Sequence, residues 1–256
     1  MITRKELEDF AKLKRLTLGN AEKDYLIDIA LLSISENTKT ELVFKGGTCL
    51  YKFHKLPRFS EDLDFSAVKE IDLNRIISKL LSDFERFGIH AVQHEKKEPY
   101  NSILITLRIE GPLFTGKPMT YANLGIDINL KSKVILEPET FIYASIYPEI
   151  AQCNVLSMKP EEIFAEKIRA LMTRQRARDL FDLHFLLQRN IHADRKLIEN
   201  KMLYYNEKFY AEQLIKRLST LSQYWKKELT GFSPYLPDYS TAKKFVVKRL
   251  KELYTL

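Results

Sequence analysis

Apolar residues recur at every third or fourth position in three stretches of the chain. This spacing predicts amphipathic helices over residues 4–18, 21–36 and 72–87. Two short segments, 41–44 and 63–65, predict strands instead, because each is too short for a helix and turn residues lie close by. The first third of the chain therefore mixes helices with short strands.

The middle of the chain alternates apolar and polar residues over 89–95, 102–110 and 124–130, as strands do when one face is buried. Helical spacing returns over residues 160–189, which open with proline and two acids, and continues through most of 194–256. This order predicts an α+β protein, in which a mixed sheet is flanked by helices and followed by a helical C-terminal lobe.

The change from strands to helices predicts two domains. We expect an α/β core with the N-terminal helices over residues 1–150 and a helical lobe over 151–256. The two cysteines do not make a disulfide framework, which favours a reduced, intracellular compartment. The sequence shows no signal peptide and no apolar run of membrane-spanning length, so we expect a cytoplasmic protein without a membrane partner.

The net charge of +7 is concentrated at the C-terminal end. Residues 201–256 contain eleven Lys and Arg against five Asp and Glu. Such a basic region favours a polyanionic partner, nucleic acid first, although a solvated helical surface has the same composition.

Three aspartates are candidates for a metal site. Asp62 and Asp64 are two residues apart on a predicted strand, so their side chains share one face. Asp127 alternates with isoleucines on another predicted strand and points away from the apolar face. Close carboxylates repel one another unless a cation lies between them, and Mg²⁺ prefers oxygen ligands. Solvent-facing acids are the alternative for each of them.

A glycine turn precedes these aspartates. Gly46 and Gly47 allow the backbone to approach a phosphate group, and Thr48 can cap the following helix or bind a phosphate oxygen. A plain strand–turn–helix junction is the alternative.

Two polar residues lie between this turn and the aspartates. Arg58 and Ser60 are candidates for contacts with a nucleotide triphosphate. For Arg58, the alternative is a surface salt bridge with Glu61.

A second cluster of charges lies within residues 160–189. On a continuous helix Lys167, Arg174 and Arg178 would form one stripe, with Asp182 near it and Asp179 further round. The polar run Thr-Arg-Gln-Arg-Ala would allow a break in this helix. Lys167 and Arg178 are candidates for phosphate contacts, and Asp179 or Asp182 would hold the lysine or act on a substrate hydroxyl. A solvated basic helix face is the alternative.

These motifs resemble those of a known superfamily. The segment KGGTCLYKFHKLPRFSEDLDF resembles the first motif of the DNA polymerase beta-like nucleotidyltransferases, in which a glycine turn precedes Asp-x-Asp. The segment RFSEDLDF is similar to the corresponding segment of the AbiEii/AbiGii toxin group, and EIFAEKIRALMTRQRARDLFDL resembles the later motif of the same group. The resemblance covers roughly residues 40–190 and implies a polymerase beta-like nucleotidyltransferase core.

The resemblance also implies roles for individual residues. By this similarity Asp62 and Asp64 bind metal, Lys167 contacts the nucleotide, and Asp179, or else Asp182, is a later essential aspartate. Gly46, Gly47 and Thr48 correspond to the phosphate-binding turn of the superfamily.

The implied activity is Mg²⁺-dependent transfer of a nucleoside monophosphate from an NTP to an acceptor hydroxyl at a two-metal site. Members of the group act as toxins opposed by a cognate antitoxin, some of them on tRNA 3′ ends. We therefore expect tRNA or another RNA as the acceptor and an antitoxin as a partner. Two alternatives stay open: an enzyme that nucleotidylates a protein hydroxyl, and a non-catalytic module on the same fold that binds nucleic acid or a partner.

Overall fold

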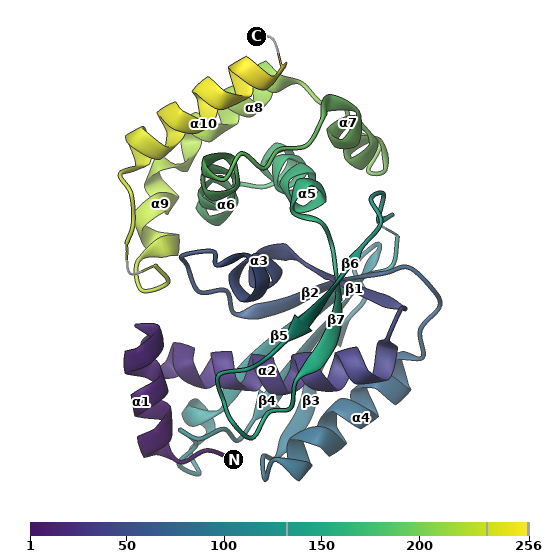
Figure 1. The fold of residues 1–256 in the computed structure, drawn as a ribbon, viewed down its shortest axis with the longest axis vertical. Coiled ribbons are helices and arrows are strands. Elements are labelled where there is room, and N and C mark those ends of the chain that lie inside the picture. The colour runs from purple at the N-terminus through teal and green to yellow at the C-terminus, as the bar shows by residue number, and fades with distance from the viewer. Residues whose placement is uncertain (132, 234, 255–256) are drawn as a thin grey trace. The chain divides into compact units, whose positions relative to one another are not determined.

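The computed structural model describes residues 1–131, 133–233 and 235–254, and the chain divides into two compact units (Figure 1). The first unit comprises residues 1–54, 59–134 and 138–157. The second comprises residues 55–58, 135–137 and 158–256. Two short segments thus belong with the second unit although the chain on both sides of them belongs to the first, an arrangement that chain order alone does not indicate.

The first unit is built on one mixed sheet. Its strands are β1 Leu42–Lys45, β2 Asp62–Ala67, β3 Ala91–Lys97, β4 Ser102–Ile109, β5 Ala122–Asn129, β6 Glu139–Tyr143 and β7 Cys153–Ser157. Among the described residues, these strands form one seven-stranded sheet in the order β3-β4-β5-β2-β1-β7-β6. β2 runs parallel to β5 and β1 runs parallel to β7, whereas the other neighbours are antiparallel. The predicted α+β fold with a mixed sheet is confirmed.

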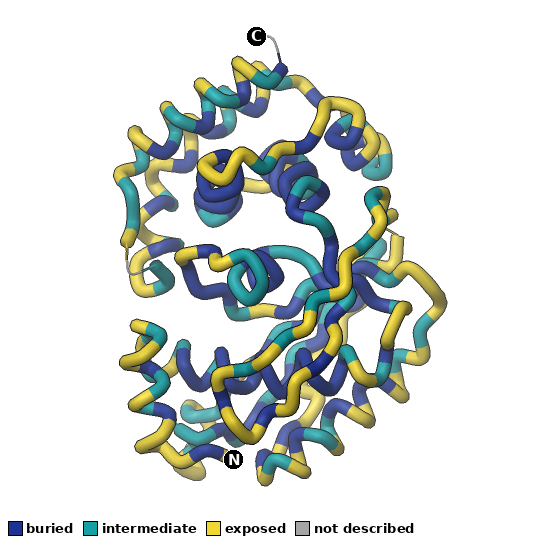
Figure 2. The backbone as a smooth tube through the Cα atoms, in the orientation of Figure 1, coloured by how far each residue is buried: buried dark blue, intermediate teal, exposed yellow. Residues whose placement is uncertain are grey.

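The helices of the first unit are α1 Arg4–Lys14, α2 Leu18–Thr38, α3 Gly46–His54 and α4 Leu73–Arg86, with a 3-10 turn at Pro118–Thr120. α2 packs on β2, β5 and β7, and α4 packs on α2 and β3, so these two helices cover one face of the sheet (Figure 1). Most of α2 is buried (Figure 2), because α1 and α4 also pack against it.

The predicted helix over residues 4–18 is wrong at its C-terminal end. α1 ends at Lys14, where Arg15 takes a left-handed conformation with φ of 55°. Thr17 then caps α2, because its side chain accepts a hydrogen bond from the backbone N–H of Asn20. The cap residue Thr17 was visible in the sequence, but the apolar spacing continued across it and concealed the break.

Two strands of the sheet were not predicted. β6 and β7 form an antiparallel pair, and β7 joins the sheet through Phe44 of β1 and Ser157. Both strands are only five residues long. Neighbouring strands decide their conformation, because β7 pairs with β1 and β6 pairs with β7.

The second unit is helical, as predicted. Its helices are α5 Pro160–Thr173, α6 Ala177–Gln188, α7 Arg195–Leu203, α8 Ala211–Leu218, α9 Ser222–Leu229 and α10 Tyr239–Tyr254, with a 3-10 turn at Ser219–Leu221. α5 and α6 are the most buried of these (Figure 2), since α7, α8, α9 and α10 all pack on one or the other. Residues 230–238 connect α9 to α10, and Pro234 lies outside the described residues. No helix in the described part of the chain is long and apolar enough to cross a membrane.

Candidate active site

Pairing of β2 with β5 brings the three candidate metal ligands onto one face of the sheet. Asp64 is the register partner of Asp127, and Asp62 is the register partner of Gly125. Partners in a parallel pair point to the same side, and Asp62 shares that side with Asp64. The opposite face of both strands is apolar and buried, because α2 packs there. The fold therefore places three carboxylates together on the less buried face.

Two glycines leave the space that the carboxylates of β2 occupy. A Cβ atom added to Gly125 would lie 2.6 Å from Oδ1 of Asp62, and one added to Gly46 would lie 2.3 Å from Oδ2 of Asp64. Gly46 also has a φ of +75°, which L residues with a side chain rarely adopt. Both glycines are therefore required by the position of an aspartate side chain.

Replacement of Gly125 with alanine is expected to displace the Asp62 carboxylate, because the contact of 2.6 Å must be relieved by the flexible side chain. We expect transfer activity to fall about 10²-fold, the order reported for small misplacements at reacting groups, with little change in melting temperature. Activity assays and thermal melts on the same preparation check this. A Gly19→Ala variant is the control, because an added Cβ at Gly19 has nothing within 4 Å and, as at Gly125, the backbone is not in the left-handed region.

Thr48 lies in the first turn of α3 and is fully buried. Its hydroxyl donates a hydrogen bond to the backbone carbonyl of Asp62. The side chain therefore connects α3 to the start of β2. The groups of the phosphate turn that can bind a ligand are the backbone N–H groups in the first turn of α3. The phosphate-binding role of Gly46, Gly47 and Thr48 stays a prediction.

Lys45 was passed over by the sequence analysis. It is the register partner of Asp64 on β1, so it lies on the same face as the aspartates and is partly exposed. A lysine that directly follows a buried strand and directly precedes two glycines was the available signal. Lys45, Asp64 and Asp127 thus form one row across three strands.

The donor set of this face suits a hard divalent cation. Carboxylate oxygens are the ligands that Mg²⁺ prefers, and the glycines keep the space around two of the carboxylates clear. Within the described residues, no three His, Cys, Asp or Glu side chains are already arranged around one metal position. The residues present fit the ion by chemistry and by their common face, and the assignment of Asp62, Asp64 and Asp127 as ligands stays a prediction.

The second cluster forms because the helix over 160–189 is broken. α5 ends at Thr173 and α6 begins at Ala177, so the stripe expected of a continuous helix does not form. Instead Lys167 on α5 faces α6, where its Nζ lies 2.9 Å from Oδ1 of Asp179 and 2.7 Å from Oδ2 of Asp182. Both aspartates hold the lysine.

Two arginines complete this cluster. Arg58 donates from two guanidinium nitrogens to the two oxygens of Asp182, at 2.7 Å each, and its side chain is only 2% exposed. The alternative of a salt bridge between Arg58 and Glu61 is wrong, since Glu61 pairs with Lys23 at 2.7 Å. Arg174, in the break between α5 and α6, donates to Asp179 at 3.0 Å and is 58% exposed.

The last two candidates differ in their surroundings. Arg178 is partly exposed on α6 and, within the described residues, makes no hydrogen bond or ion pair. Ser60 is buried in the first unit, just ahead of β2. The contacts of both with a nucleotide stay predictions.

The charges of the second cluster stabilise one another. Burial by itself would raise the pKa of Asp179 and Asp182, but the adjacent Lys167, together with Arg174 at Asp179 and Arg58 at Asp182, lowers the pKa of both below the usual value of 3.8. Burial would likewise lower the pKa of Lys167, yet the two aspartates raise it. Lys167 therefore stays a charged ammonium group at neutral pH.

These shifts predict a loss of stability in acid. Because the folded pKa of both aspartates is lowered, the unfolded chain binds more protons, so the contribution of these pairs is complete above about pH 4 and is lost as the pH falls below it. Urea unfolding of the wild type and of Asp182→Asn at several pH values checks this. We expect the free energy of unfolding to fall less steeply with acid in the variant, and equal slopes would contradict the assignment.

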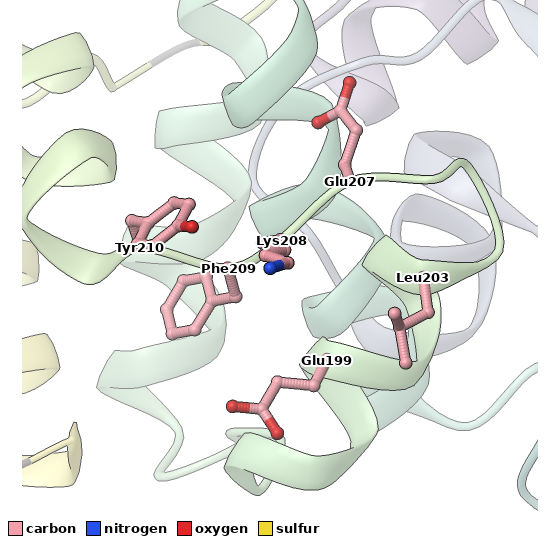
Figure 3. Close-up of a pocket in the computed structure, with 6 residues that line it drawn as sticks. All are labelled: Glu199, Leu203, Glu207, Lys208, Phe209 and Tyr210. Atoms are coloured by element: carbon pink, nitrogen blue, oxygen red, sulfur yellow. The ribbon is translucent and has the colours of Figure 1, made fainter.

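A pocket in the second unit involves other residues. It has a volume of about 270 Å³ and lies where α7 leads into α8 (Figure 3). It is lined by Glu199, Leu203, Glu207, Lys208, Phe209 and Tyr210. None of the predicted site residues is among them, and we assign this pocket no part in the chemistry.

Comparison with known proteins agrees with this geometry. The profile of the family described as "Nucleotidyl transferase AbiEii toxin, Type IV TA system" matches residues 30–252. No curated protein matches the chain.

Two solved structures share the fold. JHP933 from Helicobacter pylori is 20% identical with a TM-score of 0.59, over 94% of each chain. MenT4, the nucleotidyltransferase toxin Rv2826c from Mycobacterium tuberculosis H37Rv, is 18% identical with a TM-score of 0.68, over 100% of this chain and 91% of that one. At such identities the likeness shows the fold, whereas the family match spans most of the sequence. The chain therefore belongs to the AbiEii family of toxins from type IV toxin–antitoxin systems and is a nucleotidyltransferase that uses an NTP.

Proposed function

We propose that this protein transfers a nucleoside monophosphate from an NTP to an acceptor hydroxyl at a Mg²⁺ site formed by Asp62, Asp64 and Asp127. The observation that carries this proposal is the register of β2 on β5, which sets Asp64 beside Asp127 on the face that also carries Asp62. Divalent ions bound there would neutralise phosphate charge and order the attacking and leaving oxygens.

Other residues of the two units would supply the remaining requirements of the reaction. Gly46 and Gly47 let the backbone approach a phosphate, and the N–H groups in the first turn of α3 are donors for its oxygens. Lys167 supplies a fixed ammonium group for the nucleotide, and Arg178 and Ser60 supply further contacts. The acceptor hydroxyl gives up its proton to solvent as its oxygen bonds to the α-phosphorus, the bond from that phosphorus to the bridging oxygen breaks, and pyrophosphate leaves. Positioning and charge neutralisation provide most of the rate.

Arg58 receives a different role from the one expected of it. Both of its hydrogen bonds to Asp182 are short, and the pair is buried. A guanidinium held in this way orients Asp182, which in turn holds Lys167. We therefore assign Arg58 to the support of Lys167 and not to the triphosphate.

We propose tRNA as the acceptor, through its 3′ hydroxyl. The basic character of residues 201–256 lies on the surface of the second unit, where the exposed lysines are Lys208, Lys216, Lys226, Lys227, Lys244, Lys248 and Lys251. Lysines of this kind bind the phosphate backbone without regard to sequence, as an enzyme that acts on many tRNAs requires. NTPs and tRNA occur together in the cytoplasm, and we place the activity there, opposed by a cognate antitoxin.

The test is incubation of the purified protein with total tRNA, Mg²⁺ and each α-labelled NTP in turn. We expect label to enter tRNA with the wild type and not with the Asp62→Ala/Asp64→Ala variant. Label in protein instead of tRNA would move the acceptor to a protein hydroxyl. Absence of both transfer and metal-dependent NTP binding would leave a binding module on the transferase fold and overturn the proposal.

A further inference from the structure

The first unit contains a group of buried charges that includes none of the predicted site residues. Its centre is Lys52, near the C-terminal end of α3, whose side chain is 2% exposed. The Nζ of Lys52 lies 2.7 Å from Oδ1 of Asp24 and also pairs with Oδ1 of Asp28. Both aspartates lie one turn apart on α2, and their side chains are 0% exposed. The group therefore connects α3 to α2.

The aspartates are held by further donors. Asp28 accepts hydrogen bonds from the hydroxyls of Tyr143, at 2.8 Å, and Ser145, at 2.6 Å. Asp24 accepts from Tyr147 at 3.0 Å and from Lys14 at 2.5 Å. Two ammonium groups thus balance two carboxylates, and the bonds come from α1, α3 and the segment that begins with β6.

Stability alone does not explain such a group. Replacing a buried ion pair with well-packed apolar side chains is often neutral or stabilising, because two charges must be taken out of water. What charged hydrogen bonds add is a fixed direction and distance. An apolar contact at Lys52 would allow α3 to shift along α2, whereas the bonds to Asp24 and Asp28 hold it in one place.

The other end of α3 is the phosphate turn. There Gly46 lies against the side chain of Asp64, and the hydroxyl of Thr48 is bonded to the carbonyl of Asp62. Lys52 is six residues further along the helix, a distance of about 9 Å at the usual rise per residue. A small shift at Lys52 is therefore passed along a short rigid helix to the glycines.

We propose that Lys52 is a positioning residue, which fixes α3 through Asp24 and Asp28 so that the phosphate turn stays in register with the carboxylates of β2. This inference rests on the proposed function for its kinetic consequence, but not for its structural one. With a side chain that is 2% exposed, Lys52 would act through α3 and not through contact with a substrate.

The test compares Lys52→Met with Lys201→Met. Lys201 is also 2% exposed and pairs with two carboxylates, Glu162 at 2.5 Å and Glu166 at 3.1 Å, but it belongs to the second unit. Both variants are expected to lower the melting temperature. Only Lys52→Met is expected to raise KM for the NTP, by about tenfold, with a smaller change in kcat.

Hydrogen exchange gives a second readout that needs no substrate. In Lys52→Met we expect hydrogen exchange to rise within α3, residues 46–54, before it rises in β2 or in α2. Uniform exchange across the first unit, or an unchanged KM in the folded variant, would overturn the proposal. Failure of the wild type to transfer any nucleotide would contradict the proposed function alone, because the exchange experiment still decides what Lys52 does.

A milder variant covers the case in which Lys52→Met does not fold. Tyr143→Phe removes one hydrogen bond to Asp28 and leaves its pair with Lys52 in place. We expect hydrogen exchange to rise within residues 46–54 and KM for the NTP to rise two- to threefold. Both effects are smaller than in Lys52→Met, because removing one hydrogen bond to a charged group costs less free energy than removing the charge. A KM equal to that of the wild type, with raised exchange outside residues 46–54, would count against Lys52.

Discussion

Asp64→Asn is expected to abolish transfer, with a loss of about 10³-fold or more, while the protein stays folded. Asparagine matches aspartate in shape, so the close approach of Gly46 is preserved. It removes one negative charge from the row that Asp64 forms with Asp127, and with it the affinity of that face for a divalent cation. A loss of this size corresponds to about 4 kcal/mol of transition-state stabilisation, which is within the several kcal/mol that a bound metal ion contributes.

The measurement is transfer of label from an α-labelled NTP, with circular dichroism and a thermal melt on the same sample. Asp9→Asn is the matched control, because Asp9 is an exposed aspartate of α1 that pairs only with Lys12 on the surface. We expect the control to behave as wild type. Retained activity in Asp64→Asn would remove Asp64 from the site, and unfolding of the variant would show a structural role instead.

Asp182→Asn is expected to cause the largest loss of stability among the site variants, about 3–5 kcal/mol, because it removes the carboxylate that pairs with buried Arg58 and leaves Lys167 with Asp179 alone. Asp182 pairs with Arg58, which is 2% exposed, and with Lys167, which is 10% exposed. Neither cation has access to water that would replace the carboxylate. The protein should therefore unfold at a lower urea concentration.

The loss of stability in Asp182→Asn is to be compared with that in Asp179→Asn. Asp179 shares Lys167 with Asp182, but its other partner Arg174 is 58% exposed and stays hydrated when the charge is removed. We expect a smaller loss of about 1–3 kcal/mol. Its effect should appear mainly in transfer, since Lys167 is then held from one side only. The opposite order of the two variants in urea unfolding would show that the cluster is not organised in this way.

The local motifs were accessible from the sequence because they depend on short-range geometry. Side chains two residues apart on a strand share a face whatever the rest of the chain does, so Asp62 and Asp64 could be paired without a structure. The glycines after β1 are local signals of the same kind. The α+β order of elements followed from the change of apolar spacing along the chain, as did the helical second unit.

Contacts between distant segments were decided only by the tertiary structure. The sequence could not give the register of β2 on β5, which brings Asp64 to Asp127, because a shift of one residue would satisfy local propensity equally well. It left open whether residues 160–189 break, and that break is what turns Asp179 and Asp182 toward Lys167. Arg58 meets Asp182 across 124 residues of chain. By itself the sequence determined the order of helices and strands and how neighbours in the chain are oriented. Packing decided which side chains meet, because burial of charges is tolerated only where the fold supplies a partner.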